Sequence, residues 1–366
     1  MRRTLIAITL SLMALLMASC TLQMGYPEDL TTTNGKSTAA TTKQTTPVIQ
    51  NTTTKKPADS APQTTTDQKP KPPSTTTTKE PESTHPFKDE TVLVTYPAQV
   101  MNGGNTYTGK PPMADVSYTV VDPLNKLGIS TQKFSHAYGA AKDGKPHNIS
   151  VDNQARFDQY QYSALTWDNK TEEKVLYLTF DCGYEYENFT SLILDTLKEK
   201  DTPAAFFCTL PYLKEVPDTV ARMINEGHVV GNHSTTHPSD SSALSREALA
   251  KELLGVHNHL RVNFGYESKY FRFPSGAYSP NSLELVQSIG YRSVFWSIAH
   301  YDYDTEDQPG VDKSFATVTS RLHPGAVILL HACSSDNVAI LGDFIDYARA
   351  QGYEFRSLDD YEYWDK

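Results

Sequence analysis

The segment VLYLTFDCGY, from Val175 to Tyr184, indicates the fold of this chain more clearly than any other stretch. Its first six residues are nearly all apolar and β-prone, which is typical of a strand buried on both faces of a parallel sheet. We expect the strand to end at Asp181, and Gly183 permits a sharp turn directly after it. Taken alone, Asp181 would more often cap the following helix, so its role depends on the residues that lie beside it.

Apolar segments alternate with amphipathic segments on the C-terminal side of this strand. Further strands are predicted at 204–210, 229–231, 270–273, 292–298, 326–331 and 353–356, with helical patterns between most of them. This alternation predicts an α/β fold with a parallel sheet and right-handed crossovers. With about seven such units, a distorted (β/α) barrel is favoured over an open sheet.

Short polar motifs stand at the ends of the apolar segments. They are TFDCGY at 179–184, HSTTH at 233–237, RFPSG at 272–276, Asp302 in AHYDYD, and LLHAC at 329–333. In a parallel barrel the carboxyl ends of the strands share one face, where active sites form. We therefore expect a carboxylate base, two imidazoles, an arginine and an acid to converge there. That set of groups fits the metal-assisted hydrolysis of an amide.

His233 and His237 are candidate metal ligands. A spacing of four residues lets two imidazoles bind one ion where the segment is helical or tightly turned. Asn232, Ser234 and Pro238 favour an ordered turn at this point. Surface histidines reach the same spacing by chance, but the neighbouring motifs favour the interpretation as ligands.

Arg272 lies in FRFPSG, where Pro274 and Gly276 predict a rigid loop. A buried arginine needs an anion, and Asp181 and Asp302 are the candidates. A chain Asp302–Arg272–Asp181 would keep the base ionised and oriented. The alternative is an ordinary surface ion pair, which contributes little.

His331 follows the apolar segment AVILL and is a candidate for the acid that protonates a departing amine. Without the other motifs, a hydrogen-bonded core histidine would be the preferred interpretation. The histidines at 228, 257, 259, 300 and 323 have no comparable context, and we interpret them as structural or exposed.

Cys182 stands beside the candidate base, and three interpretations stay open for it. It is a thiolate ligand, half of a labile disulfide with Cys333, or a small core residue. Cys208, within AAFFCTL, is most simply a core residue. A nucleophilic Cys-His enzyme is disfavoured, since no helix start follows DCG to lower the pKa of the thiol.

The N-terminal region carries signals for export. Met1–Cys20 has a positive start, an apolar stretch too short to span a bilayer comfortably, and small residues before Cys20. MASC resembles a bacterial lipoprotein cleavage box, so we expect an exported protein, anchored to the membrane at the cell surface by lipid on Cys20. The alternative is a plain secretory signal.

Composition divides the rest of the chain. Residues 21–90 are rich in Thr, Lys and Pro and poor in apolar side chains, which predicts a disordered stalk. Residues 91–132 are an extension, with an extra strand or two packed on the barrel as one interpretation, and 133–366 form the catalytic domain. The net charge of the 366 residues is −10 although the stalk is lysine-rich, so the folded remainder is acidic. Such a surface disfavours nucleic acid as a partner, whereas a neutral or zwitterionic glycan meets no such barrier.

The motifs, in this order, resemble the NodB-homology domain of the polysaccharide deacetylase family (carbohydrate esterase family 4) over roughly residues 133–360. The resemblance implies a distorted (β/α) barrel that removes acetyl groups from N-acetylated sugars with a divalent metal, often zinc. It implies that Asp181 is the general base, that His331 is the general acid, and that Arg272 and Asp302 support the base.

The resemblance also implies that His233 and His237 are ligands of the metal. We place four residues in the substrate pocket, with the last of them lining the space for acetate: Tyr184, Pro274, Trp296 and Leu329. Cys182 stands where the family usually has a second aspartate, which is a metal ligand. We therefore expect a weakened or altered zinc site in which Cys182 serves as a third protein ligand.

A branch of the family that is similar to spore-cortex muramic δ-lactam de-N-acetylases also lacks that aspartate. TFDCGYE, EGHVVGNHS, FWSIA, LLHACSSDN and KFSHAYGAAKDGKPHNIS resemble this branch. The expected substrate is therefore peptidoglycan, with N-acetylmuramic acid ahead of N-acetylglucosamine. The alternatives are a deacetylase of N-acetylglucosamine or O-acetyl sugars, and a non-catalytic glycan-binding lipoprotein with a degenerate metal site.

Overall fold

The computed structural model describes residues 90–137 and 139–364. The predicted signal peptide and the predicted stalk up to residue 89 lie outside the described residues. Within the described part, no helix combines the length and the apolarity needed to cross a bilayer.

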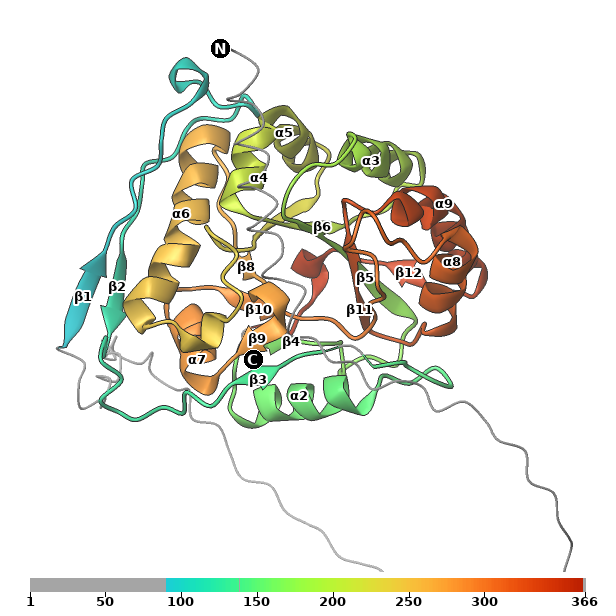
Figure 1. The fold of residues 1–366 in the computed structure, drawn as a ribbon, viewed down its shortest axis with the longest axis horizontal. Coiled ribbons are helices and arrows are strands. Elements are labelled where there is room, and N and C mark those ends of the chain that lie inside the picture. The colour runs from blue at the N-terminus through green and yellow to red at the C-terminus, as the bar shows by residue number, and fades with distance from the viewer. Residues whose placement is uncertain (1–89, 138, 365–366) are drawn as a thin grey trace, which may run out of the picture. The chain divides into compact units, whose positions relative to one another are not determined.

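A parallel sheet forms the centre of the fold (Figure 1). Its strands follow the order β11 (Ala326–His331), β5 (Val175–Cys182), β6 (Ala205–Cys208), β7 (Val229–Asn232), β8 (Tyr270–Phe271), β10 (Arg292–Val294) and β4 (Ala164–Leu165). A short strand, β12 (Glu354–Phe355), pairs in parallel with the start of β5. The predicted α/β fold with about seven parallel strands is therefore confirmed.

The sheet curls back on itself through the segment that follows β10. Ile298 forms a parallel bridge with Ile328 of β11, and the main chains of Ser297 and Ile298 both donate to Val327. This contact brings the far side of the sheet back to β11, so the strands form a curled half-barrel whose strand ends face one another.

Helices cover the outside of the sheet. They are α2 (Asn148–Gln159), α3 (Phe189–Glu199), α4 (Leu210–Glu215), α5 (Pro217–Asn225), α6 (Arg246–Phe264), α7 (Pro280–Ser288), α8 (Val311–Ser320) and α9 (Ser335–Ala350). Short 3-10 turns lie at Asn102–Gly104, Ser241–Ala243, Pro274–Gly276 and Leu358–Asp360. Ser245 and Ser279 accept hydrogen bonds from the first turns of α6 and α7, and Ser279 forms a capping box.

Both faces of β5 are buried, as its composition predicts. Leu176, Leu178 and Phe180 belong to the core cluster beneath the helices, to which Tyr212 and Phe355 also belong. The alternate residues Val175 and Tyr177 belong to a second apolar cluster. Because side chains alternate along a strand, this pattern carries Asp181 toward the second side and Cys182 toward the helices.

The extension at 91–132 packs along the outside of α6 (Figure 1). Its β1 (Thr91–Val94) and β2 (Tyr118–Val121) pair antiparallel, apart from the parallel sheet. The buried side chain of Asn258 holds the main chain of this segment, donating to Tyr96 and Val116 and accepting from Val116, at 2.9 Å each. A further short pair joins β3 (Phe134–Ser135) to β9 (Ala277–Tyr278).

Candidate active site

The polar residues predicted to converge stand at neighbouring strand ends. Asp181 on β5 lies directly beside His331 on β11 in the register of the two strands. His233 follows the last residue of β7, and Arg272 follows the last residue of β8. Parallel strands therefore bring together four side chains that are separated by long stretches of sequence.

Arg272 is completely buried and forms an ion pair with Asp181. One guanidinium nitrogen donates to Asp181 Oδ1 at 2.8 Å, and the others donate to the carbonyls of Val294 and Phe295 at 3.0 Å. The guanidinium also lies 4.1 Å from the centre of the Phe207 ring. This rigid support fixes the orientation of the Asp181 carboxylate.

The electrostatic surroundings keep Asp181 ionised. Burial alone would raise the pKa of this carboxyl, but the charge of Arg272, with contributions from His233 and His331, outweighs burial and lowers the pKa below its ordinary value. Oδ1 is engaged by Arg272, and Oδ2 lies 3.5 Å from His233 Nε2. Asp181 is thus an ionised acceptor with one oxygen directed toward the histidines.

His233 and His237 lie together in a tight turn rather than on a helix. Their ring centres are 4.9 Å apart, and Ser234 Oγ accepts from the main chain of His237 at 2.9 Å. His233 Nδ1 lies 2.9 Å from the carbonyl of Arg272, which assigns the proton to Nδ1 and leaves a lone pair on Nε2. Burial lowers the pKa of both imidazoles, that of His233 to about 4, so both are neutral near pH 7.

This donor set fits a divalent cation in its chemistry. A neutral imidazole whose second nitrogen donates to a carbonyl is the usual form of a histidine ligand, and His233 has that form. Among residues 90–137 and 139–364, however, no group of three or more His, Cys, Asp or Glu side chains is arranged to hold a metal ion. The described residues therefore offer two nitrogen donors, and water is needed to complete a coordination shell.

Cys182 does not join the two histidines, contrary to the expected third ligand. It is 1 % exposed, lies in the core cluster beneath the helices, and is paired in register with Cys208, whose thiol it contacts. Burial, together with Cys208, raises the pKa of the Cys182 thiol well above its ordinary value, so the sulfur is not a thiolate. Strand alternation explains this placement, because Asp181 and Cys182 are consecutive residues of β5.

The described cysteines are all free, so the structure has no disulfide between Cys182 and Cys333. Cys333 instead lies near the main chain of Tyr303, with 3.8 Å between its sulfur and the carbonyl oxygen. The core-filling interpretation of Cys182 is the one that agrees with this arrangement.

Asp302 supports His331 and not Arg272, which corrects the expected chain from Asp302 through Arg272 to Asp181. Its Oδ1 lies 2.7 Å from His331 Nδ1, and its Oδ2 accepts from the main chain of His331 at 2.8 Å. Arg272 is engaged instead by Asp181 and by the carbonyls of Val294 and Phe295.

The same pair sets the protonation of His331. Burial would lower the pKa of this imidazole, but the adjacent Asp302 carboxylate outweighs burial and raises the pKa above its ordinary value. Since Nδ1 is engaged by Asp302, the partly exposed ring has Nε2 available to donate a proton. Thus the pKa of the carboxyl on one side of the site is lowered, and the pKa of the imidazole on the other side is raised.

Two residues that the sequence did not indicate complete the support of His331. Asn337, in the first turn of α9, donates to Asp302 Oδ2 at 2.6 Å and to the carbonyl of His331 at 3.0 Å. His300 Nε2 lies 3.0 Å from Asn337 Oδ1 and 3.5 Å from Asp302 Oδ2. The available signal was a run of polar residues directly after the predicted strand, at the start of a helix that Ser334 caps.

The four predicted pocket residues occupy different environments. Leu329 and Trp296 are nearly buried and belong to one apolar cluster, and the Trp296 ring lies 5.7 Å from the Arg272 guanidinium. Pro274 is buried in the 3-10 turn after Arg272. Tyr184 is 37 % exposed, and its hydroxyl faces the thiol of Cys333. Trp296 is thus close to the Asp181 pair, whereas Tyr184 lies on the exposed loop after β5.

Comparison with known proteins shows that the chain is similar to deacetylases that act on polysaccharides. The family model described as "Polysaccharide deacetylase" matches residues 168–294. The chain is 37% identical to the peptidoglycan-N-acetylmuramic acid deacetylase PdaA of Bacillus subtilis over 201 residues, which cover 55% of this chain and 75% of that protein. It is 31% identical over 256 residues to a peptidoglycan-N-acetylglucosamine deacetylase of Bacillus cereus, covering 67% of this chain and 89% of that protein.

A solved structure gives the same result for the fold. The structure of Bacillus subtilis PdaA, described as a family 4 carbohydrate esterase, superposes with a TM-score of 0.59 at 33% sequence identity. The superposition covers 63% of this chain and 97% of that one. The shared region therefore includes nearly the whole of the solved relative.

Proposed function

Since the chain belongs to the polysaccharide deacetylase family, we propose that it hydrolyses N-acetyl groups on the glycan strands of bacterial peptidoglycan. One observation carries this proposal: Asp181, paired with Arg272, stands in register beside His331, whose pKa the paired Asp302 raises. A base and an acid with pKa values moved apart by separate partners are what amide hydrolysis needs.

In the proposed mechanism, the base and the acid act in sequence. Asp181 takes a proton from the attacking water through Oδ2, while Arg272 keeps the carboxylate in place. His331 then donates a proton from Nε2 to the nitrogen of the departing sugar amine, and acetate is released. Asp302 holds the imidazole by Nδ1 throughout, so that the ring presents the other nitrogen to the substrate.

We further propose that His233 and His237 hold a divalent metal, with zinc as the first candidate. When bound, such a metal polarises a carbonyl and lowers the pKa of water. The low pKa of each imidazole supports this role, because a ligand must be neutral. Cys182 packs against Cys208, so the two histidines would be the protein ligands and water would complete the coordination.

For the substrate, we propose N-acetylmuramic acid ahead of N-acetylglucosamine, because the muramic acid deacetylase has the higher identity of the two peptidoglycan deacetylases compared. The test is acetate release from purified peptidoglycan, with mass spectrometry of the digested strands to locate the new amine. Acetate with amine on muramic acid is expected. Amine on glucosamine, or acetate only from O-acetyl sugars, would select the alternative substrates. Glycan binding without acetate would favour the non-catalytic lipoprotein.

Replacement of Asp302 by Asn is expected to move the alkaline limb of the pH–rate profile to lower pH. The Asp302 charge raises the pKa of His331, so the acid stays protonated, and active, up to a higher pH than an ordinary histidine would. Without the charge, the proton is lost earlier as the pH rises. Initial rates of acetate release across the pH range check this. An unchanged alkaline limb would mean that His331 is not the titrating acid.

The predicted export signal leads to a proposal about location, although it lies outside the described residues. We propose that lipid on Cys20 anchors the protein to the membrane. Cys20→Ala is expected to shift the protein from the detergent-soluble membrane fraction to the culture medium or to block signal cleavage, as judged by fractionation and mass. Unchanged fractionation with an unmodified Cys20 in the parent protein would contradict the anchor.

A further inference from the structure

The turn that carries His233 and His237 has a strained main chain. Ser234 and His237 have φ angles of 72° and 53°, in the left-handed region that residues other than glycine seldom adopt. Residues 233–237 belong to neither a helix nor a strand, so no regular hydrogen-bond ladder holds them. Such a conformation persists only where the surrounding structure holds it, and contacts from outside the turn are therefore needed.

The helix α6 supplies such contacts. Thr235 Oγ1 donates to the main-chain carbonyl of Glu252 at 2.9 Å. The Glu252 carboxylate accepts from the main chain of Thr236 through Oε2 and from the Thr236 hydroxyl through Oε1, at 2.8 Å each. Hydrogen bonds to a carboxylate are stronger than those between neutral groups, and two of them fix an orientation. Glu252 thus holds the residue that directly precedes His237.

A glycine inside α6 is independent evidence that the turn must lie close to this helix. Glycine is less favourable than alanine in a helix interior, so Gly255 indicates a packing requirement. A Cβ at this position would lie 2.2 Å from Thr235 Oγ1 and 3.2 Å from the ring of Tyr96. The absence of a side chain at position 255 therefore lets α6 approach the turn as closely as it does.

We propose that Glu252 is a positioning residue for the metal site, because it holds the turn in the conformation that presents both imidazoles to one cation. This inference rests on the proposed function, which assigns His233 and His237 to the metal, and extends it to a residue of α6. With two nitrogen donors from the protein, the affinity for the cation depends on both rings being held in place before it binds.

Two other roles of Glu252 have different consequences. As a third ligand it would have to stand with the histidines, but no such group of three is found within residues 90–137 and 139–364. As a nearby negative charge it would attract the cation without ordering the turn. Glutamine at this position removes the charge but retains an acceptor for the main chain of Thr236 and an amide for its hydroxyl, so this variant separates charge from positioning.

The first test measures zinc affinity of the chelated, metal-free protein by competition with a chromophoric chelator. Glu252→Ala is expected to weaken zinc binding about 10–100-fold, the usual loss when a residue that orients metal ligands is removed. Glu252→Gln is expected to stay within about threefold of the parent, because it keeps the hydrogen bonds. Glu247→Ala, which removes a carboxylate paired with Lys251 on the same helix, is the matched control and should leave the affinity unchanged.

A second variant tests the close approach of α6 to the turn. Gly255→Ala is expected to weaken zinc binding by about tenfold or more, because the added methyl group displaces Thr235. Alanine favours the helix itself, so circular dichroism should show α-helix content no lower than that of the parent. A loss of affinity in a fully helical variant then reports on the turn and not on the fold.

Amide hydrogen exchange in the metal-free protein separates this inference from the proposed function. The main chains of Thr236 and His237 donate to Glu252 and to Ser234 Oγ, so their peptide is expected to exchange faster in Glu252→Ala and not in Glu252→Gln. Faster exchange and weaker zinc binding support the inference even if the parent releases no acetate from peptidoglycan, a result that would remove the proposed function alone. No zinc binding by the parent, parent-like affinity or exchange in Glu252→Ala, or an equal loss in Glu252→Gln would each overturn it.

Discussion

Asp181→Asn is expected to reduce the rate of acetate release by at least about 10²–10⁴-fold, the usual contribution of a positioned general base. The reason is local, since asparagine retains the shape of the side chain and one oxygen for Arg272 but cannot take a proton from water. We expect the KM to change little, because the substitution removes a group that acts on water and not on the sugar. Stopped or continuous assays of acetate release check both parameters.

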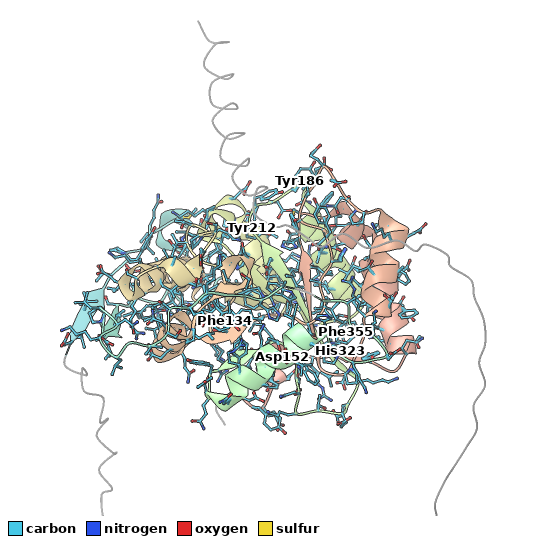
Figure 2. All side chains as sticks on the ribbon, turned by 60° about the horizontal axis from the view of Figure 1, so that its bottom comes forward. Phe134, Asp152, Tyr186, Tyr212, His323 and Phe355 are labelled. Carbon is cyan, nitrogen blue, oxygen red and sulfur yellow. The ribbon has the colours of Figure 1, made fainter. Side chains whose placement is uncertain are left out.

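The same substitution has a predicted cost in stability. It leaves the buried charge of Arg272 without its counter-ion, and removal of one partner of a buried pair typically costs about 3–5 kcal/mol. Activity must therefore be measured at a temperature where circular dichroism shows the variant to be folded. Asp152→Asn, on the exposed side of α2 (Figure 2), is the control for loss of a carboxylate. Near-normal turnover in folded Asp181→Asn would remove Asp181 from the mechanism.

His331→Ala is expected to lower the rate by a similar factor of about 10²–10⁴ with an N-acetyl sugar as substrate. A sugar amine is a poor leaving group unless it is protonated, and His331 is placed to protonate it. The loss should be much smaller for 4-nitrophenyl acetate, because a nitrophenolate departs without a proton. Asp181→Asn, in contrast, should impair both substrates, since each needs an activated water.

The comparison of the two variants on the two substrates thus separates the acid from the base. If His331→Ala loses as much activity on 4-nitrophenyl acetate as on the amide, His331 does not act as the acid for the leaving group. If it loses activity on neither substrate, the imidazole has only a structural role beside Asp302.

The convergence of the site could be predicted because it follows from the architecture. An almost wholly apolar strand that ends in Asp181 indicates a parallel sheet, and the ends of parallel strands meet at one edge. Arg272 could be paired with Asp181 from the sequence for a similar reason. Its strand, β8, ends at Phe271, so the guanidinium starts from the same rim.

The partner of Asp302 could not be predicted in this way. Asp302 lies in an irregular loop after β10, and periodicity gives no direction for a side chain outside a helix or strand. The sequence also predicted one continuous strand at 292–298. In the structure β10 ends at Val294, and Ile298 pairs with Ile328 of β11. That change carries the loop past His331 and away from a second contact with Arg272.

Cys182 illustrates a different limit of the sequence. Its neighbour Asp181 faces the site, and the resemblance to the family placed a metal ligand at position 182. Alternation along β5 was already visible in the sequence and argued for the opposite face, where the structure places Cys182 beside Cys208. For Cys182, the alternation of side chains along β5 therefore predicted the direction of the side chain correctly, whereas the family motif did not.

The proposed catalysis requires one metal ion at the strand ends, and a single titration tests this requirement most directly. Chelated, metal-free protein is supplied with zinc in steps, and bound metal and acetate release from peptidoglycan are measured in the same samples. We predict that both rise together and level off at about one metal per chain, and that His233→Ala and His237→Ala abolish both. Acetate release that is unchanged in the chelated protein, or one bound metal with no release of acetate, would contradict metal-dependent deacetylation at this site.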